Sequence, residues 1–197
     1  MPSKTVAVTG GIGSGKTEVI NIIKSFGYKV YNLDEIYREL LKNYEFLQKV
    51  CEILKVFPIL NSDGSYTFDH RKAGENAFSD EKIKTELNAF THPRIMAKFK
   101  ELISAENGLV FCEVPLLFES GLKGEFDKVI VVTRDLRIRI EAVKTRDDLT
   151  EEEIIKRIKN QFDYANFIPD EHTIVIENDC GKEVLYEKVK SVIEKIC

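Results

Sequence analysis

The sequence predicts an α/β protein, a three-layer sandwich in which a five-stranded parallel sheet carries helices on both faces. Two observations support this prediction. Short apolar runs rich in β-branched residues alternate with segments whose apolar residues recur at helical spacing. A glycine-rich stretch, residues 10–17, lies between the first strand and the first helix and matches G-x-x-x-x-G-K-[ST]. The fold class is therefore that of the P-loop NTPases.

Composition narrows the functional classes. The chain has 197 residues, enough for one α/β domain with a modest insertion. Its formal net charge of -4 gives no overall basic field for nucleic acid or an acidic membrane. The four cysteines form no C-x-x-C pair, so we expect no zinc site and a reducing, cytoplasmic setting. We expect no signal peptide or membrane span, because no apolar run approaches about 20 residues.

The glycine-rich stretch has the right context for a phosphate-binding loop. Residues 5–9 form a β-branched strand, and Gly27 ends the helix that follows the loop. Val19, Ile22, Ile23 and Phe26 form the apolar side of that helix. A flexible glycine-rich turn is the alternative, but the strand and helix around the loop argue against it. The sequence therefore predicts nucleotide binding.

Phosphate chemistry explains the residue types in this loop. Glycines allow several backbone N–H groups to point at one anion, and the helix start adds more N–H groups. Lys16 supplies a cation for the β- and γ-phosphates, and the Thr17 hydroxyl can ligate Mg²⁺. The predicted nucleotide-binding residues are Gly11, Ile12, Gly13, Ser14, Gly15, Lys16 and Thr17.

A second strand is expected over residues 28–33, with Asp34 at its carboxyl end. Functional groups gather at the carboxyl ends of strands in parallel sheets, so Asp34 is a candidate for chemistry. The alternative is that Asp34 only caps the helix expected after it. Both roles remain open at this point.

Residues 44–107 are expected to form a mostly helical insertion that binds the second substrate, between core segments 1–43 and 108–197. A turn is predicted at residues 61–64. A helix over residues 83–90 should break or bend at His92-Pro93, and Pro93 should open a further helix.

The rest of the core contains a candidate acid and a candidate lid. Residues 109–114 form an apolar strand carrying Glu113, which suggests a role assisting Mg²⁺; the alternative is a charge that reaches solvent at the strand tip. Further strands are expected over residues 127–133 and 174–176.

Two basic helices within about residues 135–165 suggest a lid that closes over phosphates, and a solvated charged surface is the alternative.

At this level of detail the chain resembles the dephospho-CoA kinase family over nearly its whole length. Beyond the P-loop, the resemblance is most specific at His92-Pro93-Arg94-Ile95 and at Pro115-Leu116-Leu117-Phe118-Glu119. The other matching positions are residues 30–34, Asp63-Gly64, Arg71, residues 78–80, Arg146-Asp147, Arg157, Gln161, Asn178 and Gly181. The chain departs from the family pattern at Asn32, at Glu113, at residues 172–173, and at Ala142, where an arginine is usual and Arg139 is the candidate substitute.

The resemblance implies a phosphotransferase that uses ATP and Mg²⁺ to phosphorylate the 3′-hydroxyl of dephospho-CoA, the final step of CoA biosynthesis. It implies small-molecule partners, with neither nucleic acid nor a membrane involved, and we expect a monomer. The implied catalytic residues are Lys16, Asp34 and Arg146. Arg139 and Asn178 join the nucleotide site, while Asp34, Arg71, His92 and Leu117 serve the acceptor. His92 has an alternative structural role at the helix break.

A P-loop is also found in proteins of three other functional kinds. Another small-molecule P-loop kinase is possible in principle, although a Gly-Gly-Gly loop of the shikimate kinase type is absent. A GTPase is disfavoured because the chain has neither Asn-Lys-x-Asp nor Asp-x-x-Gly. A non-catalytic ATP-binding module is weakened by the presence of Lys16, Thr17 and Asp34.

Overall fold

The computed structural model describes residues 3–197, and their contacts divide the chain into two compact units. The first unit contains the chain up to Asn32 together with Ser104–Cys197, and the second is Leu33–Ile103. The helix that follows the second strand therefore belongs by its contacts to the second unit, whereas the sequence boundary at residue 44 placed it with the core.

The first unit is built on a five-stranded sheet whose pairings are all parallel, with strand order β2-β5-β1-β6-β7. Its strands are β1 (Lys4–Thr9), β2 (Val30–Asn32), β5 (Leu109–Glu113), β6 (Lys128–Thr133) and β7 (Thr173–Glu177). The predicted α/β class and the five-stranded parallel sheet are confirmed. The second strand is shorter than predicted, because Leu33 already begins the next helix.

Helices α1 (Lys16–Ser25) and α8 (Lys182–Ile196) pack together on one face of this sheet. The side chains of β1 alternate between the two faces of the sheet, as in any strand. Val6 and Val8 join the core beneath these helices, while Ala7 and Thr9 point to the other face and are also buried. Burial on both faces explains why the central strands are almost continuously apolar.

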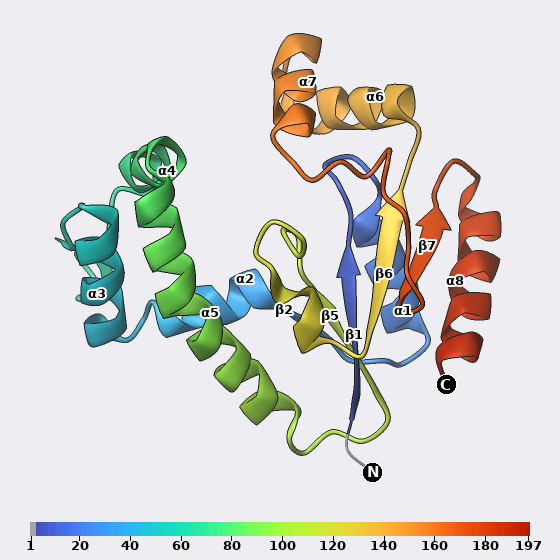
Figure 1. Cartoon of the computed structure of the whole chain (residues 1–197), viewed down its shortest axis with the longest axis horizontal. Helices are drawn as coiled ribbons and strands as arrows, with labels where there is room; N and C mark the ends of the chain where they lie inside the picture. The colour runs from blue at the N-terminus through green and yellow to red at the C-terminus, as the bar shows by residue number, and fades with distance from the viewer. Residues whose placement is uncertain (1–2) are drawn as a thin grey trace. The chain divides into compact units, whose positions relative to one another are not determined.

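Two further helices, α6 (Leu136–Asp147) and α7 (Glu151–Lys159), lie beyond the carboxyl ends of the strands, above the arrowheads in Figure 1. Thr150 caps α7 through the Glu153 N–H, and the Glu153 carboxylate accepts from the Thr150 N–H, which forms a capping box. Ile140, Val143 and Ile154 form a small core between the two helices. The short 3₁₀-helix η1 spans Leu122–Glu125.

The second unit is mostly helical, as predicted. Its elements are α2 (Leu33–Leu40), α3 (Tyr44–Leu54), β3 (Ile59–Leu60), β4 (Tyr66–Thr67), α4 (His70–Ser79) and α5 (Glu81–Ile103). Its core is formed by apolar residues of α3, α4 and α5, including Leu47, Val50 and Ile83. The predicted turn at residues 61–64 joins the antiparallel pair β3–β4, which was not predicted because two-residue strands are too short to show a period.

The expected second helix starting at Pro93 is wrong, since α5 is one helix with Pro93 inside it. Proline lacks an N–H and crowds the preceding turn, which leaves carbonyl groups there without their usual partners. One residue after the proline, Arg94 Nη1 donates to the Phe90 carbonyl at 2.7 Å, and its guanidinium lies 3.9 Å from the Phe90 ring centre. Thr91 Oγ1 donates to the Leu87 carbonyl at 2.8 Å.

Candidate nucleotide-binding site

The loop between β1 and α1 has the conformation that its glycines predict. Gly10, Gly13 and Gly15 all have positive φ angles, of 156°, 77° and 83°. The Ser14 N–H donates to the Gly11 carbonyl at 3.1 Å, which closes the loop on itself. The loop therefore presents its amides at the start of α1, where the helix dipole favours an anion.

Asn178 supports this loop from beneath. It lies directly after β7 and is almost completely buried, with Nδ2 donating to the Ser14 carbonyl at 3.0 Å and to Glu18 Oε2 at 3.1 Å. A Cβ on Gly15 would lie 1.9 Å from that same nitrogen. Asn178 thus braces the loop, and its amide nitrogen is engaged there rather than directed at a base.

Lys16 meets Glu113, the acid at the end of β5. Lys16 Nζ lies 3.3 Å from Glu113 Oε1, and Asn32 Nδ2 donates to Glu113 Oε2 at 2.8 Å. Parallel register places Val8 and Asn32 on either side of Glu113. Lys16 comes to the same place through the loop that follows β1. Glu113 therefore has partners at the sheet edge, and a simple surface charge does not describe it.

The oxygen atoms near the loop fit a magnesium ion. Thr17 is exposed in the first turn of α1, and the Glu113 carboxylate stands beside Lys16. Among residues 3–197, no group of three or more His, Cys, Asp or Glu residues is placed to hold a metal. Magnesium at phosphate sites uses one or two protein oxygens together with phosphate and water, so this sparse hard-oxygen set fits it.

Residues from the α6–α7 region hold the backbone of Ile12 on both sides. Arg139 Nε donates to the Ile12 carbonyl at 2.9 Å, and the Ile12 N–H donates to Gln161 Oε1 at 2.8 Å. Arg139 also approaches Gly11 so closely that a Cβ there would lie 2.6 Å from Nη2. Burial lowers the pKa of Arg139, so a nearby anion would relieve the cost of its charge.

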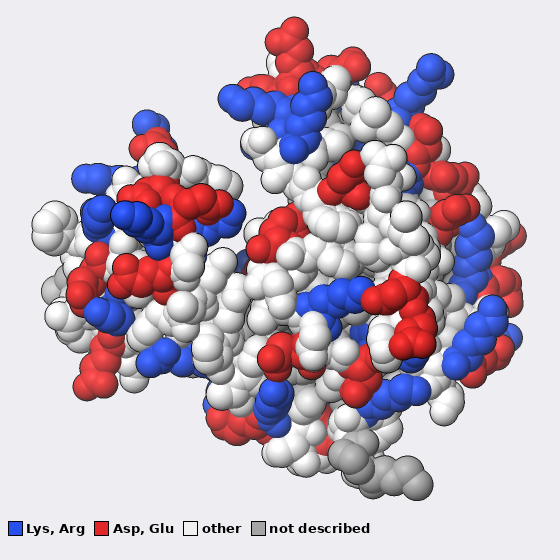
Figure 2. All heavy atoms as spheres, viewed as in Figure 1, with Lys and Arg blue, Asp and Glu red and all other residues white. Residues whose placement is uncertain are grey.

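Arg146 lines a cavity of about 470 Å³ over the P-loop, together with Ala142, Val143 and Gln161. Its guanidinium forms a two-point contact with Asp147, with Nε–Oδ1 and Nη2–Oδ2 distances of 2.6 and 2.7 Å. The arginine side chain remains 63% exposed, so it is accessible from the cavity. On the face seen in Figure 2, acidic and basic side chains lie together over α6 and α7 at the top of the view.

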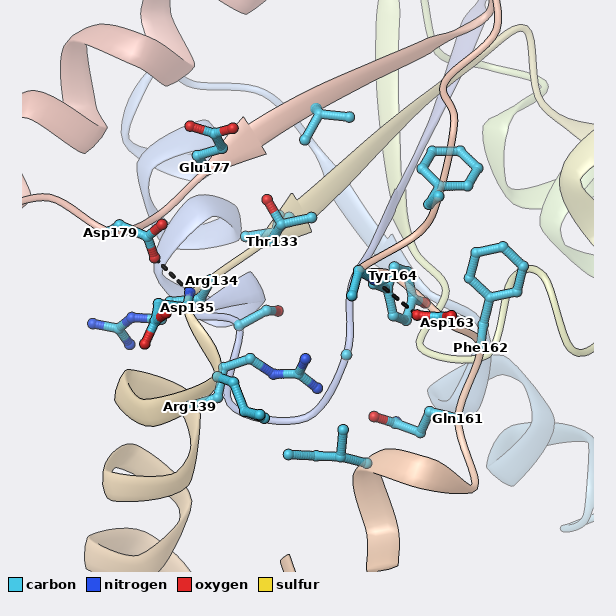
Figure 3. Close-up of a pocket in the computed structure, with 18 of the residues that line it drawn as sticks. Thr133, Arg134, Asp135, Arg139, Gln161, Phe162, Asp163, Tyr164, Glu177 and Asp179 are labelled. Carbon is cyan, nitrogen blue, oxygen red and sulfur yellow. Dashed lines mark hydrogen bonds between the residues drawn. The ribbon is translucent and has the colours of Figure 1, made fainter. Parts of the chain in front are cut away.

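A larger cavity of about 860 Å³ adjoins the P-loop (Figure 3). Its walls come from the ends of β6 and β7, from α6, and from the coil after α7. Labelled lining residues in Figure 3 include Thr133, Arg134, Asp135, Arg139, Phe162, Asp163, Tyr164, Glu177 and Asp179. Its size suits a nucleoside, and its position places that nucleoside next to the phosphate loop.

Sequence reasoning missed the aromatic wall of this region. Phe118 stacks on Phe162 with ring centres 4.2 Å apart, and Phe162, Tyr164 and Phe167 form further ring contacts. The Tyr164 hydroxyl lies 3.2 Å from Thr9 Oγ1, and burial raises the pKa of Tyr164 to about 12. Residue spacing in the sequence gave no signal for this cluster, since Phe118 lies more than forty residues before Phe162.

The predicted acceptor residues lie in different surroundings. Asp34 is exposed in the first turn of α2, inside the helix rather than at its cap. Arg71 pairs with Glu75 one turn along α4, and partial burial lowers the pKa of His92 in α5. Leu117 is completely buried, so the residue of its loop that faces solvent is Leu116.

Comparison with known proteins decides the family. The model of the family described as "Dephospho-CoA kinase" matches residues 4–183. The chain belongs to the dephospho-CoA kinase family. Two curated dephospho-CoA kinases, from Fusobacterium nucleatum and Thermus thermophilus, are each 32% identical to it. The alignments cover 97% of this chain in both cases, and 97% and 91% of the relatives.

Solved structures agree with this family. A dephospho-CoA kinase from Campylobacter jejuni matches with a TM-score of 0.68 and 29% identity, over 98% of this chain and 97% of that one. A Thermus thermophilus structure described only as TT1252 matches over the full length of both chains, with a TM-score of 0.81 and 29% identity. The chain is thus a kinase, a transferase that uses ATP in the final step of CoA biosynthesis. This result favours a kinase over the GTPase and the non-catalytic module.

Proposed function

We propose that the chain transfers the γ-phosphoryl group of ATP to the 3′-hydroxyl of dephospho-CoA by the residue roles set out below. The observation that carries the proposal is the braced P-loop, with Lys16 beside Glu113 and a nucleoside-sized cavity next to it. Phosphoryl transfer passes through a loose transition state that asks mainly for positioning and charge neutralisation. This loop supplies both.

The P-loop holds the triphosphate. Backbone amides of residues 11–17 point at the β- and γ-phosphates, and Lys16 adds a mobile cation to them. When the nucleotide binds, Lys16 exchanges its contact with Glu113 for phosphate oxygens. Thr17 and Glu113 would hold the magnesium ion, Glu113 indirectly. The ion, when bound, neutralises phosphate charge.

Arginines above the loop complete the neutralisation of charge. Arg146 lines the cavity over the P-loop, and its exposed guanidinium can leave Asp147 for a phosphate. Arg139 already touches the loop and lines the nucleoside cavity, which supports the view that it substitutes for the arginine missing at Ala142. Closure of α6 and α7 as a lid would bring both closer to the transferred group.

The acceptor is assigned to the helical region of residues 44–107, with Asp34 as the proton acceptor. An exposed carboxylate can orient an alcohol and take its proton, as general-base catalysis requires. Arg71 and His92 would help to place the CoA precursor, and the loop at Leu117 would line its path. Arg71 is 89% exposed and pairs with Glu75 of its own helix, so it can turn to an anionic ligand.

A coupled assay of ADP release with dephospho-CoA tests the reaction, with adenosine, AMP and shikimate as alternative acceptors. We expect turnover with dephospho-CoA alone. Lys16→Ala should lower turnover by about 10²-fold or more, because phosphate charge loses its cation. Comparable turnover with AMP or shikimate would contradict the assigned acceptor.

Asp34→Asn tests the proton acceptor. We expect turnover to fall by about 10²-fold or more while ATP still binds, because the amide cannot accept the proton. Glu35→Gln is the matched control, since Glu35 is the neighbouring exposed acid in the same turn of α2. Near-normal turnover of Asp34→Asn would contradict the role.

We propose a cytoplasmic location and a monomeric state for the chain. The cysteines at 51, 112, 180 and 197 are free thiols in residues 3–197, which supports a reducing, cytoplasmic location. Across the same described residues, no helix has the length and apolar character needed to cross a bilayer. We propose a monomer, which light scattering would test.

A further inference from the structure

Three residues of the coil that follows α7 form hydrogen bonds with the P-loop and its surroundings. The Gln161 carboxamide accepts from the Ile12 N–H at 2.8 Å, and the Phe162 N–H donates to Glu119 Oε1 at 2.8 Å. The Tyr164 hydroxyl bonds to Thr9 Oγ1 at 3.2 Å. Figure 3 shows Gln161 on this coil with its carboxamide directed toward the P-loop. The coil is therefore fixed to the P-loop and to the end of β1.

We propose that Gln161 is a positioning residue for phosphoryl transfer, which sets the conformation of the P-loop through the Ile12 peptide. An N–H that donates to a side chain takes its direction from that acceptor. Ile12 precedes Gly13, whose φ of 77° turns the loop toward Ser14 and Gly15. The direction of this peptide therefore decides where the next amides point, and those amides hold phosphate.

The P-loop needs such support because its conformation leaves a polar atom buried without a hydrogen-bond partner. Within residues 3–197, Ser14 Oγ is buried and has no hydrogen-bond partner. A buried polar atom left unsatisfied destabilises the arrangement that contains it. External contacts hold the loop in this form: Gln161 and Arg139 on Ile12, and Asn178 on the Ser14 carbonyl. An anion accepting from Ser14 Oγ would relieve the cost on binding.

Of the three side chains that hold the P-loop, Gln161 is the one whose effect on the loop can be measured apart from any effect of its own charge on phosphate. Arg139 brings a cation that itself attracts phosphate, and Asn178 also contacts Glu18. Gln161 is neutral, and the contact that it makes to the loop uses only its amide oxygen. It also follows α7 directly, so the contact links the conformation of the P-loop to the position of the α6–α7 pair. This inference rests on the proposed function, because it deepens the role of the same site.

The test compares three variants of the full chain. Gln161→Met keeps the size of the side chain and removes the acceptor, Gln161→Glu keeps an acceptor oxygen, and Asn160→Ala is a control at the exposed neighbouring position. Hydrogen exchange of the Ile12 amide is measured by NMR in the nucleotide-free protein. ATP affinity is measured without acceptor, and kcat is measured with dephospho-CoA.

For Gln161→Met we expect Ile12 exchange to be faster by about fivefold or more. We also expect ATP affinity to be about tenfold weaker and kcat about ten- to a hundredfold lower, with thermal stability close to that of the parent. Gln161→Glu should keep the Ile12 amide protected, although its charge weakens ATP binding. Asn160→Ala should match the parent protein.

Two results would overturn the inference. One is unchanged protection of the Ile12 amide in Gln161→Met; the other is lost protection with ATP affinity and kcat both within twofold of the parent. Should Gln161→Met prove unstable, Gln161→Asn draws the acceptor back by one methylene and is read in the same way. Inactivity of the parent toward dephospho-CoA would reject the proposed function, while exchange and ATP affinity still test Gln161.

Discussion

Gly15 shows why single residues of the P-loop cannot be exchanged. It has a φ of 83°, and a Cβ at this position would lie 1.9 Å from Asn178 Nδ2. Gly27 has a similar φ of 86°, but nothing lies within 4 Å of its absent Cβ. The two glycines therefore separate the effect of backbone strain from the effect of a close contact.

Gly15→Ala and Gly27→Ala form a matched pair for stability and binding. Gly27→Ala should lose about 1–2 kcal/mol of unfolding free energy from the left-handed conformation alone, with ATP binding unchanged. Gly15→Ala should lose more and abolish measurable ATP binding, since Asn178 must move. Denaturant unfolding and calorimetric titration measure the two effects. Equal losses in the two variants would show that the Asn178 contact is unimportant.

Glu113 permits a second prediction at the scale of one residue. Glu113→Gln keeps an acceptor for Asn32 but removes the charge 3.3 Å from Lys16. Because Glu113 would help to hold the magnesium ion once Lys16 has turned to the phosphates, loss of its charge should lower kcat/KM for ATP about ten- to a hundredfold. Steady-state kinetics at saturating dephospho-CoA measure this value.

The control for Glu113 is another paired acid in the same unit. Glu106→Gln breaks a contact with Lys29 and should leave kcat/KM for ATP within about twofold, because it lies outside both cavities that adjoin the P-loop. If Glu113→Gln were equally harmless, Glu113 would be serving structure alone.

At the scale of elements, patterns with strong local causes were predicted correctly. In the sequence, Thr150-Glu151-Glu152-Glu153 has the pattern of a capping box, and this box does begin α7, because both of its hydrogen bonds form within four residues. A break or a bend was predicted at Pro93, and the break is wrong, because proline disfavours a helix only by a few kcal/mol. Burial of Ile95, Met96 and Phe99 of α5, together with the Arg94 contact to Phe90, outweighs that preference.

Pro93→Ala tests the continuity of α5. Alanine restores the missing N–H and removes the clash with the preceding turn, so the unfolding free energy should rise by about 1–3 kcal/mol. Chemical denaturation measures this change. Lys100→Ala, at an exposed position of the same helix, should shift it by less than about 0.5 kcal/mol. A fall in stability for Pro93→Ala would mean that the proline shapes a bend on which the packing depends.

At the scale of the whole molecule, a contact between segments far apart in the sequence makes the stability of the fold depend on pH in the acid range. Asp170 bonds to Lys123 and to Thr173 Oγ1, and these contacts hold the pKa of its carboxyl below the ordinary value, Lys123 contributing most. A carboxyl whose pKa is lower in the folded state binds fewer protons there than when unfolded. Its stabilisation is therefore present above about pH 4 and is lost as pH falls further.

Asp170→Asn should lower the melting temperature at pH 7, and its difference from the parent should shrink as pH falls below about 4. The amide oxygen still accepts from Thr173, so the difference reports mainly the charge facing Lys123. Melting curves at several pH values measure it, with Glu171→Gln as the exposed neighbouring control. A difference that stayed constant down to pH 2 would exclude the ion pair as its cause.

The sequence by itself determined the α/β class, the P-loop, the capped start of α7 and the family, because each is written in residues close together along the chain. The tertiary structure alone decided which distant side chains hold the loop. Asn178, Gln161 and Glu113 are separated from it by about a hundred residues or more; parallel strand order places the ends of β5 and β7 beside the loop, and the coil after α7 adds Gln161. Local spacing carries no record of such contacts, since they depend on which strands become neighbours.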